Sequence, residues 1–110
     1  MKHLLFDLID CPPDLLDDED FVRLSAWNAA KESKSDLINI SCHKFKPQGV
    51  TALAMLAESH LSIPTWPEKG VAQCDIFTCG EKCDPHKAVE YLGKVFKATK
   101  VETDAFDRLL

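Results

Sequence analysis

Residues 36–57, DLINISCHKFKPQGVTALAMLA, contain two strand patterns separated by a short turn sequence. In the first part, successive side chains alternate, so Ile38, Ile40 and Cys42 share one face of a strand, and we expect that face to contact the core. The last part is almost continuously apolar, so the second strand should be covered on both faces. The intervening KPQG predicts the turn.

The opposite face of the first strand is unusual for a surface that meets only water, because polar and aromatic side chains occur on it together. It carries Leu37, Asn39, Ser41, His43 and Phe45. Two helices cannot cover both faces of one sheet. We therefore expect this second face to meet solvent, a ligand or another subunit.

The rest of the chain alternates between strand and helix patterns. An acidic first turn and an apolar stripe predict a helix from Asp14 to about Glu32, and a second helix is expected to begin at Asp84 and Pro85. The order β-α-β-β-β-α-β indicates an α+β fold, a two-layer α/β sandwich with one mainly antiparallel sheet and two helices on one face. Further strands are expected at residues 3–10 and 71–78 and near 99–103, with extended chain over 60–65.

Composition and charge are those of an ordinary globular chain and argue against several partners. The 110 residues suit a single domain, residues 1–110, with 45% hydrophobic and 28% charged residues. A net charge of −5 and the lack of a basic stripe disfavour nucleic acid. No apolar run reaches the roughly 20 residues that span a bilayer, and the N-terminus is a poor signal peptide. No membrane partner is expected, and a cytoplasmic location is the default.

The cysteines point to neither a disulfide framework nor a metal site. There are five of them, and the odd number, without an export signal, argues against paired disulfides. Cys79, Cys83 and His86 have C-x3-C-x2-H spacing. A closed zinc site also needs a second pair of ligands, which the sequence lacks, so no metal is expected.

The Glu58–Ser59 bond follows the apolar strand directly, and a serine there has three interpretations. The simplest is a turn residue. A hydrolase nucleophile is poorly supported, because there is no Gly-x-Ser-x-Gly elbow and His60, next along a strand, should point to the opposite face. In the third, the Ser59 hydroxyl attacks the Glu58 carbonyl and forms an ester. Elimination then cuts the chain, and the resulting dehydroalanine hydrolyses to a pyruvoyl group, which can form a Schiff base with an amine and withdraw electrons from a carbanion.

Three blocks of this sequence resemble the prokaryotic S-adenosylmethionine decarboxylases, small pyruvoyl-dependent enzymes of spermidine synthesis. They are HKFKPQGVTALAMLAESHLSI, TWPEKG and DIFTCGEKCDP, and with the opening HLLFDLIDC they extend the resemblance from about His3 to Lys97. It implies a two-layer α/β sandwich that dimerises sheet to sheet. It also implies that Ser59 becomes the pyruvoyl cofactor, leaving a β chain of residues 1–58 and an α chain of residues 59–110.

The resemblance gives roles to further residues. Cys79 matches the cysteine that returns a proton to the substrate carbon after carbon dioxide leaves. Phe45 matches an aromatic residue that stacks on adenine, and Glu68 matches the carboxylate that binds the ribose hydroxyls. Glu58 supplies the carbonyl of the cleaved bond, and Thr51 stands where the family has a serine that takes part in processing. The implied partners are S-adenosylmethionine and a second cleaved αβ protomer, in a homodimer.

Pro64 departs from the family pattern, which has a histidine at this position. The resemblance assigns that histidine to the elimination step, and proline has no side chain that accepts a proton. Three interpretations stay open. The protein decarboxylates S-adenosylmethionine, with His43, His60 or water serving in elimination; it is a pyruvoyl-dependent decarboxylase of another amino acid, such as ornithine or arginine; or it is an unprocessed, non-catalytic homologue. Because Phe45 and Glu68 are retained, a nucleoside substrate is favoured over a basic amino acid.

Overall fold

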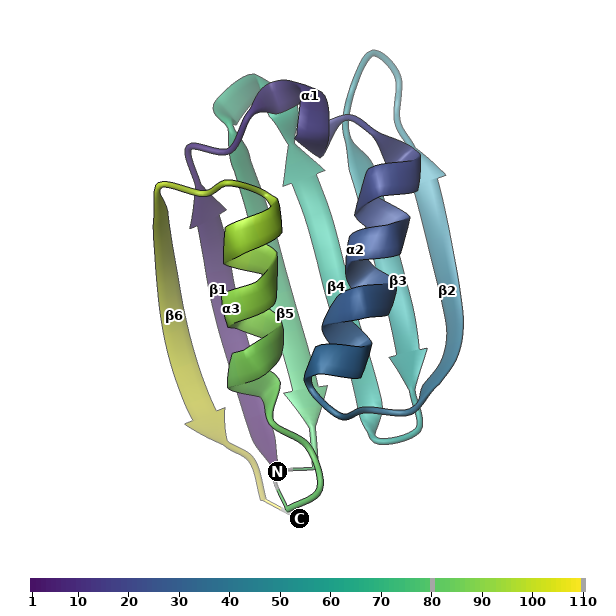
Figure 1. Cartoon of the computed structure of the whole chain (residues 1–110), viewed down its shortest axis with the longest axis vertical. Helices are drawn as coiled ribbons and strands as arrows, with labels where there is room; N and C mark the ends of the chain where they lie inside the picture. Colours follow the sequence, from purple (N-terminus) through teal and green to yellow (C-terminus); the bar gives the residue numbers. More distant parts are fainter. Residues whose placement is uncertain (80, 110) are drawn as a thin grey trace.

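The computed structural model describes residues 1–79 and 81–109, in which the chain forms a six-stranded sheet (Figure 1). Gly80, in the FTCGE block, and Leu110, the last residue of the expected α chain, lie outside the described residues. The strands are β1 (Lys2–Ile9), β2 (Leu37–Lys44), β3 (Val50–Leu56), β4 (Ser59–Trp66), β5 (Val71–Thr78) and β6 (Lys100–Asp107). They lie in the order β2-β3-β4-β5-β1-β6, and each neighbouring pair is antiparallel.

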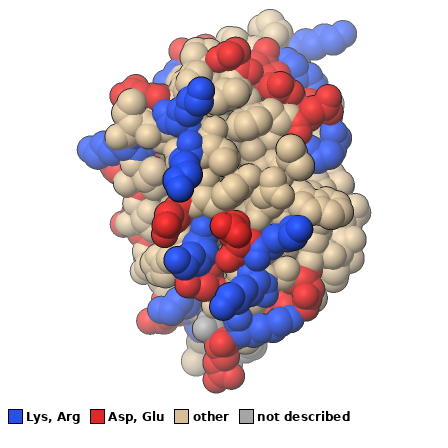
Figure 2. Space-filling model, in the orientation of Figure 1, with Lys and Arg blue, Asp and Glu red and all other residues tan. Residues whose placement is uncertain are grey.

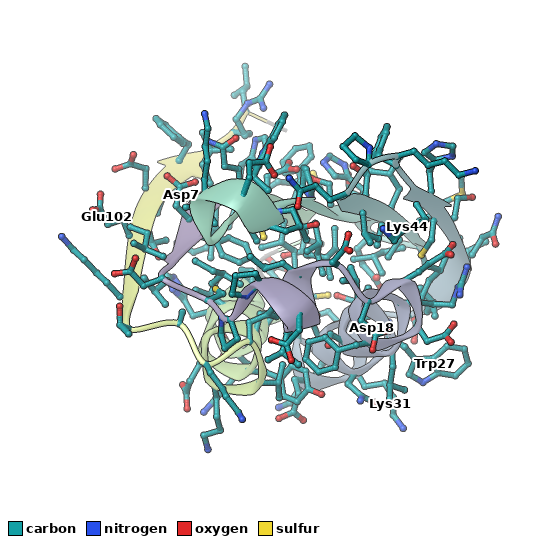
Figure 3. All side chains as sticks on the ribbon, turned by 90° about the horizontal axis from the view of Figure 1, so that it is seen from above. Asp7, Asp18, Trp27, Lys31, Lys44 and Glu102 are labelled. Atoms are coloured by element: carbon teal, nitrogen blue, oxygen red, sulfur yellow. The ribbon has the colours of Figure 1, made fainter. Side chains whose placement is uncertain are left out.

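Two long helices cover one face of this sheet and leave the other face without helices (Figure 3). The first, α2 (Glu19–Glu32), lies over β2 and β3, and the second, α3 (Pro85–Val95), lies over β1 and β5 (Figure 1). A single turn, α1 (Pro13–Leu16), precedes α2, and the short 3-10 helix η1 (Pro67–Lys69) joins β4 to β5. This two-layer α/β sandwich confirms the predicted fold class.

The core lies between the sheet and the helices, because alternate residues of each strand point towards the helices. Phe6 of β1 and Ile63 of β4 are buried there, and so is Phe96, which follows α3. The Phe96 ring packs edge-on against Phe21 of α2, with ring centroids 5.0 Å apart. Burial of these large side chains contributes roughly 1.5–3 kcal/mol each.

The outer surface of the helix layer carries acidic and basic side chains close together (Figure 2). On α2, for example, Arg23 lies 3.4 Å from both Glu19 and Asp20. Exposed pairs of this kind stabilise a fold by less than about 1 kcal/mol. Among the described residues, no helix is both long and apolar enough to cross a membrane.

The face of the sheet that carries no helix, called the open face below, is unusually apolar. Large hydrophobic side chains on it are between 43% and 55% exposed: Leu5, Leu53, Met55, Trp66 and Phe106. Contiguous exposed apolar surface commonly marks an interface. The open face therefore fits the expectation that it meets a ligand or a second subunit.

Two predicted elements have different bounds in the structure. Extended residues 60–65 belong to a separate strand, β4, which folds back on β3 after a tight turn. The helix predicted from Asp14 is interrupted, and α2 begins after Asp18, whose carboxylate accepts a hydrogen bond from the Phe21 N–H at 3.1 Å. Asp17 lies in the break between α1 and α2. Its carboxylate accepts hydrogen bonds from Lys44 Nζ at 2.7 Å and from the Gly49 N–H at 2.8 Å.

The two outer strands also differ from their sequence patterns. A register shift between Leu37 and Asn39 leaves Ile38 62% exposed, so Leu37 packs against the core in its place. The prediction that Ile38 faces the core is therefore wrong, because a bulge reverses the alternation. The last strand, expected near 99–103, runs from Lys100 to Asp107, and all its residues are exposed. Such an edge strand has no core-facing pattern by which a sequence could reveal its length.

Candidate active site

The turn between β3 and β4 carries the Glu58–Ser59 bond and is fastened to neighbouring segments. The Ala57 N–H donates to the Asp36 carbonyl at 2.8 Å, and the Asp36 N–H donates to Glu58 Oε1 at 3.1 Å. Lys82 Nζ lies 3.0 Å from Glu58 Oε2 and also pairs with the Asp36 carboxylate. The hydrogen bond from Lys82 lowers the pKa of Glu58. The Glu58 side chain therefore holds the peptide bond in place as an ionised anchor.

Ser59 and His60 are in contact, although the sequence predicts that they point to opposite faces. Ser59 Oγ lies 3.2 Å from His60 Nδ1. That prediction is wrong at this position because alternation applies within a pleated strand, whereas Ser59 is the first residue of β4 and follows a turn. A serine hydroxyl next to an imidazole nitrogen is the arrangement that activates a serine nucleophile.

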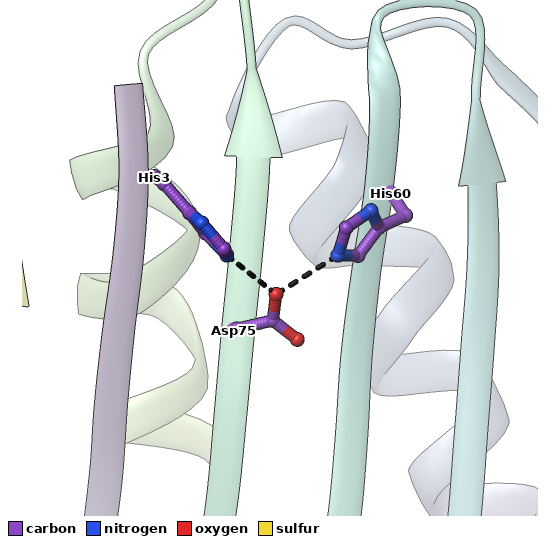
Figure 4. Close-up of side chains that lie close together, drawn as sticks. All are labelled: His3, His60 and Asp75. Carbon is purple, nitrogen blue, oxygen red and sulfur yellow. Dashed lines mark hydrogen bonds and ion pairs between the residues drawn. The ribbon is translucent and has the colours of Figure 1, made fainter. Parts of the chain in front are cut away.

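Asp75 of β5 accepts hydrogen bonds from three side chains and holds His60 in place. Its Oδ2 lies 2.8 Å from His60 Nε2 and 2.8 Å from His3 Nε2 (Figure 4). Its Oδ1 accepts from the Ser62 hydroxyl. Burial alone would raise the pKa of Asp75, but the hydrogen bonds from Ser62, His3 and His60 outweigh it and the net shift is downward. Asp75 is therefore an ionised acceptor at neutral pH.

The hydrogens on both imidazole rings follow from their partners. Arg108 NH1, which can only donate, lies 3.2 Å from His3 Nδ1, so this nitrogen accepts and His3 Nε2–H donates to Asp75. Because the Asp75 carboxylate only accepts, His60 Nε2 must also carry a hydrogen. In the neutral ring, His60 Nδ1 is then the acceptor for the Ser59 hydroxyl.

The same three side chains are the ones that could hold a metal ion. Ligand atoms of His3, His60 and Asp75 all lie within 4.8 Å of one another. Their hydrogen bonds already account for this arrangement. Across residues 1–79 and 81–109, no metal-type cluster contains Cys79, Cys83 or His86, and the Cys83 thiol instead donates to the Lys34 carbonyl at 3.6 Å.

A pocket of about 360 Å³ opens on the open face beside Ser59 and His60, between residues of β2 and β3 that include Ser41 and Met55. Cys79 lies at the same end of the sheet, two residues beyond Phe77, which pairs with His60. Its thiol is half-buried and free. The structure therefore brings Glu58, Ser59 and Cys79 to one end of the sheet.

The other residues singled out by the resemblance lie at the opposite end. Thr51 pairs with Pro64, which is five residues along β4 from Ser59, a separation of roughly 16 Å in an extended strand. Phe45 follows β2 and Glu68 lies in η1, so each is roughly 20 Å from Ser59 in the same chain. One chain alone therefore does not bring Ser59 together with Phe45 and Glu68.

Four residues at the Ser59 end were not found from the sequence: His3, Asp75, Lys82 and Arg108. Asp75 and His3 had a weak signal, since each is a polar residue beside large apolar residues of its strand. Such a residue commonly pairs with another on the same face. Nothing local in the sequence indicates Lys82 or Arg108, because their partners lie far away along the chain.

The comparisons with known proteins agree on one family. The family model for S-adenosylmethionine decarboxylase matches residues 2–109. A relative from Synechococcus sp., named S-adenosylmethionine decarboxylase proenzyme, is 50% identical over 88% of this chain and 76% of its own length. A relative of the same name from Methanococcus vannielii is 46% identical over 92% of this chain and 83% of its own.

The fold comparison gives the same result. The crystal structure of the adenosylmethionine decarboxylase from Aquifex aeolicus superposes with a TM-score of 0.91, at 30% identity, over 99% of this chain and 90% of that one. Both the family resemblance and the predicted sandwich are thereby confirmed. This chain belongs to the S-adenosylmethionine decarboxylase family.

Proposed function

We propose that this chain is a self-processing decarboxylase of S-adenosylmethionine, which supplies decarboxylated S-adenosylmethionine for spermidine synthesis. Membership of the family and the contact between Ser59 and His60 support this proposal. Ser59 attacks the Glu58 carbonyl, the chain divides into residues 1–58 and 59–110, and a pyruvoyl group remains at residue 59. That group takes up the substrate amine and withdraws electrons from the carbon that loses carbon dioxide.

The surroundings of Ser59 fit such a group. The preceding carbonyl belongs to an anchored turn, a base lies beside the hydroxyl, and a pocket opens next to it. Cys79, at the same end of the sheet, protonates the product carbon. The five free cysteines suit a reducing compartment, so a cytoplasmic location is part of the proposal.

The substrate-binding residues require a second copy of the chain. Phe45 stacks on the adenine and Glu68 binds the ribose, but both lie roughly 20 Å from Ser59 in the same protomer. Two copies that pack through their apolar open faces, with strands running in opposite directions, bring the Ser59 end of one against the Phe45 end of the other. The result is a homodimer of cleaved protomers with two composite sites, each of which combines Ser59 of one chain with Phe45 and Glu68 of the other.

Pro64 supports the alternative that the chain remains unprocessed. An intact-mass measurement of freshly purified protein distinguishes a processed chain from an unprocessed one. We expect two masses, for residues 1–58 and for residues 59–110 with a terminal ketone. Ser59→Ala is the uncleaved control. Release of carbon dioxide from S-adenosylmethionine, but not from ornithine or arginine, then fixes the substrate. An intact chain that releases no carbon dioxide would refute the proposed activity.

The composite site has its own test. Neither Ser59→Ala nor Phe45→Ala homodimers should be active, but a mixed dimer should regain one working site, with Ser59 from one chain and Phe45 from the other. After unfolding and refolding the two variants together, we expect about a quarter of wild-type activity. Failure of the mixture to exceed its components would place each site within a single chain.

A further inference from the structure

We infer that His60, oriented by Asp75, is the base that removes the Ser59 hydroxyl proton in the first step of self-cleavage. This inference rests on the proposed function, and it assigns the residue that starts the reaction in a chain where Pro64 replaces the family histidine. It concerns formation of the ester, which precedes elimination.

The geometry favours proton transfer in one direction. Ser59 Oγ and His60 Nδ1 are 3.2 Å apart, within reach of a hydrogen bond. His60 Nε2 donates to Asp75 Oδ2 at 2.8 Å, which leaves Nδ1 as the nitrogen that accepts. Asp75 is itself fixed by His3 and by the Ser62 hydroxyl. The serine, imidazole and carboxylate thus form a connected series like that of serine hydrolases.

The charges around His60 also favour the transfer. When Nδ1 takes the proton, the new positive charge lies beside the ionised Asp75 carboxylate of β5. A second titratable neighbour is His3 of β1, which already donates to the same carboxylate. From β3, His60 is faced by uncharged Met55, its ladder partner, and Phe77 of β5 adds an aromatic ring 6.1 Å away. The positive charge of Arg108 is directed at the far nitrogen of His3.

The chemical step balances without any further reactant. The Ser59 Oγ–H proton moves to His60 Nδ1 while Oγ forms a bond to the Glu58 carbonyl carbon. The bond from that carbon to the Ser59 nitrogen then breaks, and the proton held by His60 passes to this nitrogen, which becomes a free amine. The chain is now joined through an ester, and His60 is neutral again. Glu58, anchored by Lys82 and Asp36, keeps the carbonyl in place during the exchange.

The other histidines do not lie at this position. His43 pairs with Thr51 at the opposite end of the sheet and stacks edge-on against Phe45, with ring centroids 4.6 Å apart. His86 is exposed on α3, in the helix layer. Among the described residues, His60 is the only histidine hydrogen-bonded to the Ser59 hydroxyl.

Hydroxylamine separates ester formation from the later steps. It cuts the ester at the Glu58 carbonyl and releases a fragment ending in a Glu58 hydroxamate and a fragment beginning with an intact Ser59 amine. Intact-mass spectra of wild-type protein in hydroxylamine should show both fragments. In His60→Gln, we expect their rate of appearance to fall about 100-fold, as for loss of a general base. His86→Gln is the matched control and should behave like wild type.

Chemical rescue distinguishes a base from a packing residue. In His60→Ala, free imidazole can enter the pocket next to Ser59. It should restore cleavage by hydroxylamine in proportion to its concentration. Thermal melts of both His60 variants should match uncleaved Ser59→Ala protein, which shows that they are folded. Ester formation at the wild-type rate in His60→Gln would overturn the inference. Slow cleavage by hydroxylamine whose rate imidazole does not restore would also overturn the inference and assign His60 a packing role.

The role of Asp75 as a positioning residue has a spectroscopic readout. In uncleaved Ser59→Ala protein, ¹⁵N chemical shifts should place the His60 hydrogen on Nε2. In Ser59→Ala with Asp75→Asn, an amide N–H can donate to Nε2, and the hydrogen should move to Nδ1. Asp75→Asn with Ser59 intact should then split slowly, because Nδ1 no longer accepts. An unchanged tautomer with slow splitting would refute positioning by Asp75.

These outcomes also separate this inference from the proposed function. If wild-type protein forms the ester through His60 but gives no ketone and no carbon dioxide, the decarboxylase activity is refuted and the role of His60 stands. If it matures and decarboxylates while His60→Gln forms the ester normally, only the role of His60 is refuted. If wild-type protein is split neither alone nor by hydroxylamine, both are refuted.

Discussion

Thr51 and Pro64 face each other across β3 and β4, so the two departures from the family pattern are direct neighbours. Cross-strand partners have Cβ atoms about 4.5–5.5 Å apart. The side chains of Thr51 and Pro64 are therefore close neighbours. The pair also lies roughly 16 Å from Ser59 in the same chain. In the proposed homodimer, substitutions here would therefore affect self-cleavage through the Ser59 of the second copy.

Restoring a proton acceptor at position 64 should accelerate processing. If the proposed homodimer forms, the new imidazole of Pro64→His can assist elimination at the Ser59 of the second copy. We then expect division of the chain to become at least about tenfold faster, given that general bases contribute about 10²–10⁴-fold. The rate is measured by intact mass over time. Pro64→Ala, which removes the proline without adding a base, is the control. Equal rates in both variants would mean that the missing base does not limit processing.

Removal of Lys82 should reduce stability in a pH-dependent manner. Hydrogen bonds from Lys82 lower the pKa values of Asp36 and Glu58 below their ordinary values of 3.8 and 4.5. A lowered folded-state pKa contributes stability above the unfolded-state value, and this is lost as the pH falls through the folded-state pKa. In the uncleaved Ser59→Ala protein, Lys82→Met should therefore lower the urea midpoint of unfolding at pH 7. The difference between the midpoints with and without Lys82 should shrink below about pH 4.

Lys100→Met is the control for this experiment. Lys100 lies 3.2 Å from Glu102 on the exposed edge strand, and such pairs contribute little. Its removal should shift the midpoint only slightly at any pH. If the difference in midpoint between Ser59→Ala protein with and without Lys82→Met stayed constant down to pH 2, Lys82 would act through packing of its aliphatic chain.

Replacing the Thr78 hydroxyl should increase stability. Thr78 is fully buried, and its Oγ1 has no hydrogen-bond partner among residues 1–79 and 81–109. Thr78→Val keeps the shape and removes the uncompensated polar group, so we expect a gain of about 1 kcal/mol in the free energy of unfolding. Denaturant unfolding measures it, and a loss of stability would reveal a partner for this hydroxyl.

Thr65→Val is the matched control, with the opposite sign. Thr65 Oγ1 donates to the Leu16 carbonyl at 2.7 Å and accepts from the Val50 N–H at 2.9 Å. Valine leaves both of these buried groups unpaired, and we expect a loss of about 1–3 kcal/mol.

The cysteines should differ in reactivity. Burial raises the pKa of Cys11 to about 11 and that of Cys74 well above its ordinary value, so neither forms much thiolate at pH 8. Iodoacetamide at pH 8 should therefore modify half-buried Cys79 first, and carbon dioxide release should fall in parallel. Peptide mass spectrometry locates the label. Full activity after complete alkylation of Cys79 would exclude it as the proton donor.

The sequence by itself determined the local features of this protein. Alternation and apolar runs predicted most of the strands and both long helices, and the family blocks located Ser59 shortly after the apolar strand. These signals are local, because side-chain period and turn chemistry depend on neighbouring residues. The helix start at Asp18 was missed because several neighbouring acidic residues could each cap a helix. The bulge at Ile38 was missed because it depends on the register between two strands.

Only the tertiary structure decided which of these residues meet. His3, Asp75 and His60 come together because β1 and β4 both lie next to β5, and the ladder registers place the three side chains on one face. The same registers separate Ser59 from Phe45 and Glu68 by most of the length of the sheet. Strand order and register depend on packing between segments far apart in the chain, and no window of the sequence contains that information.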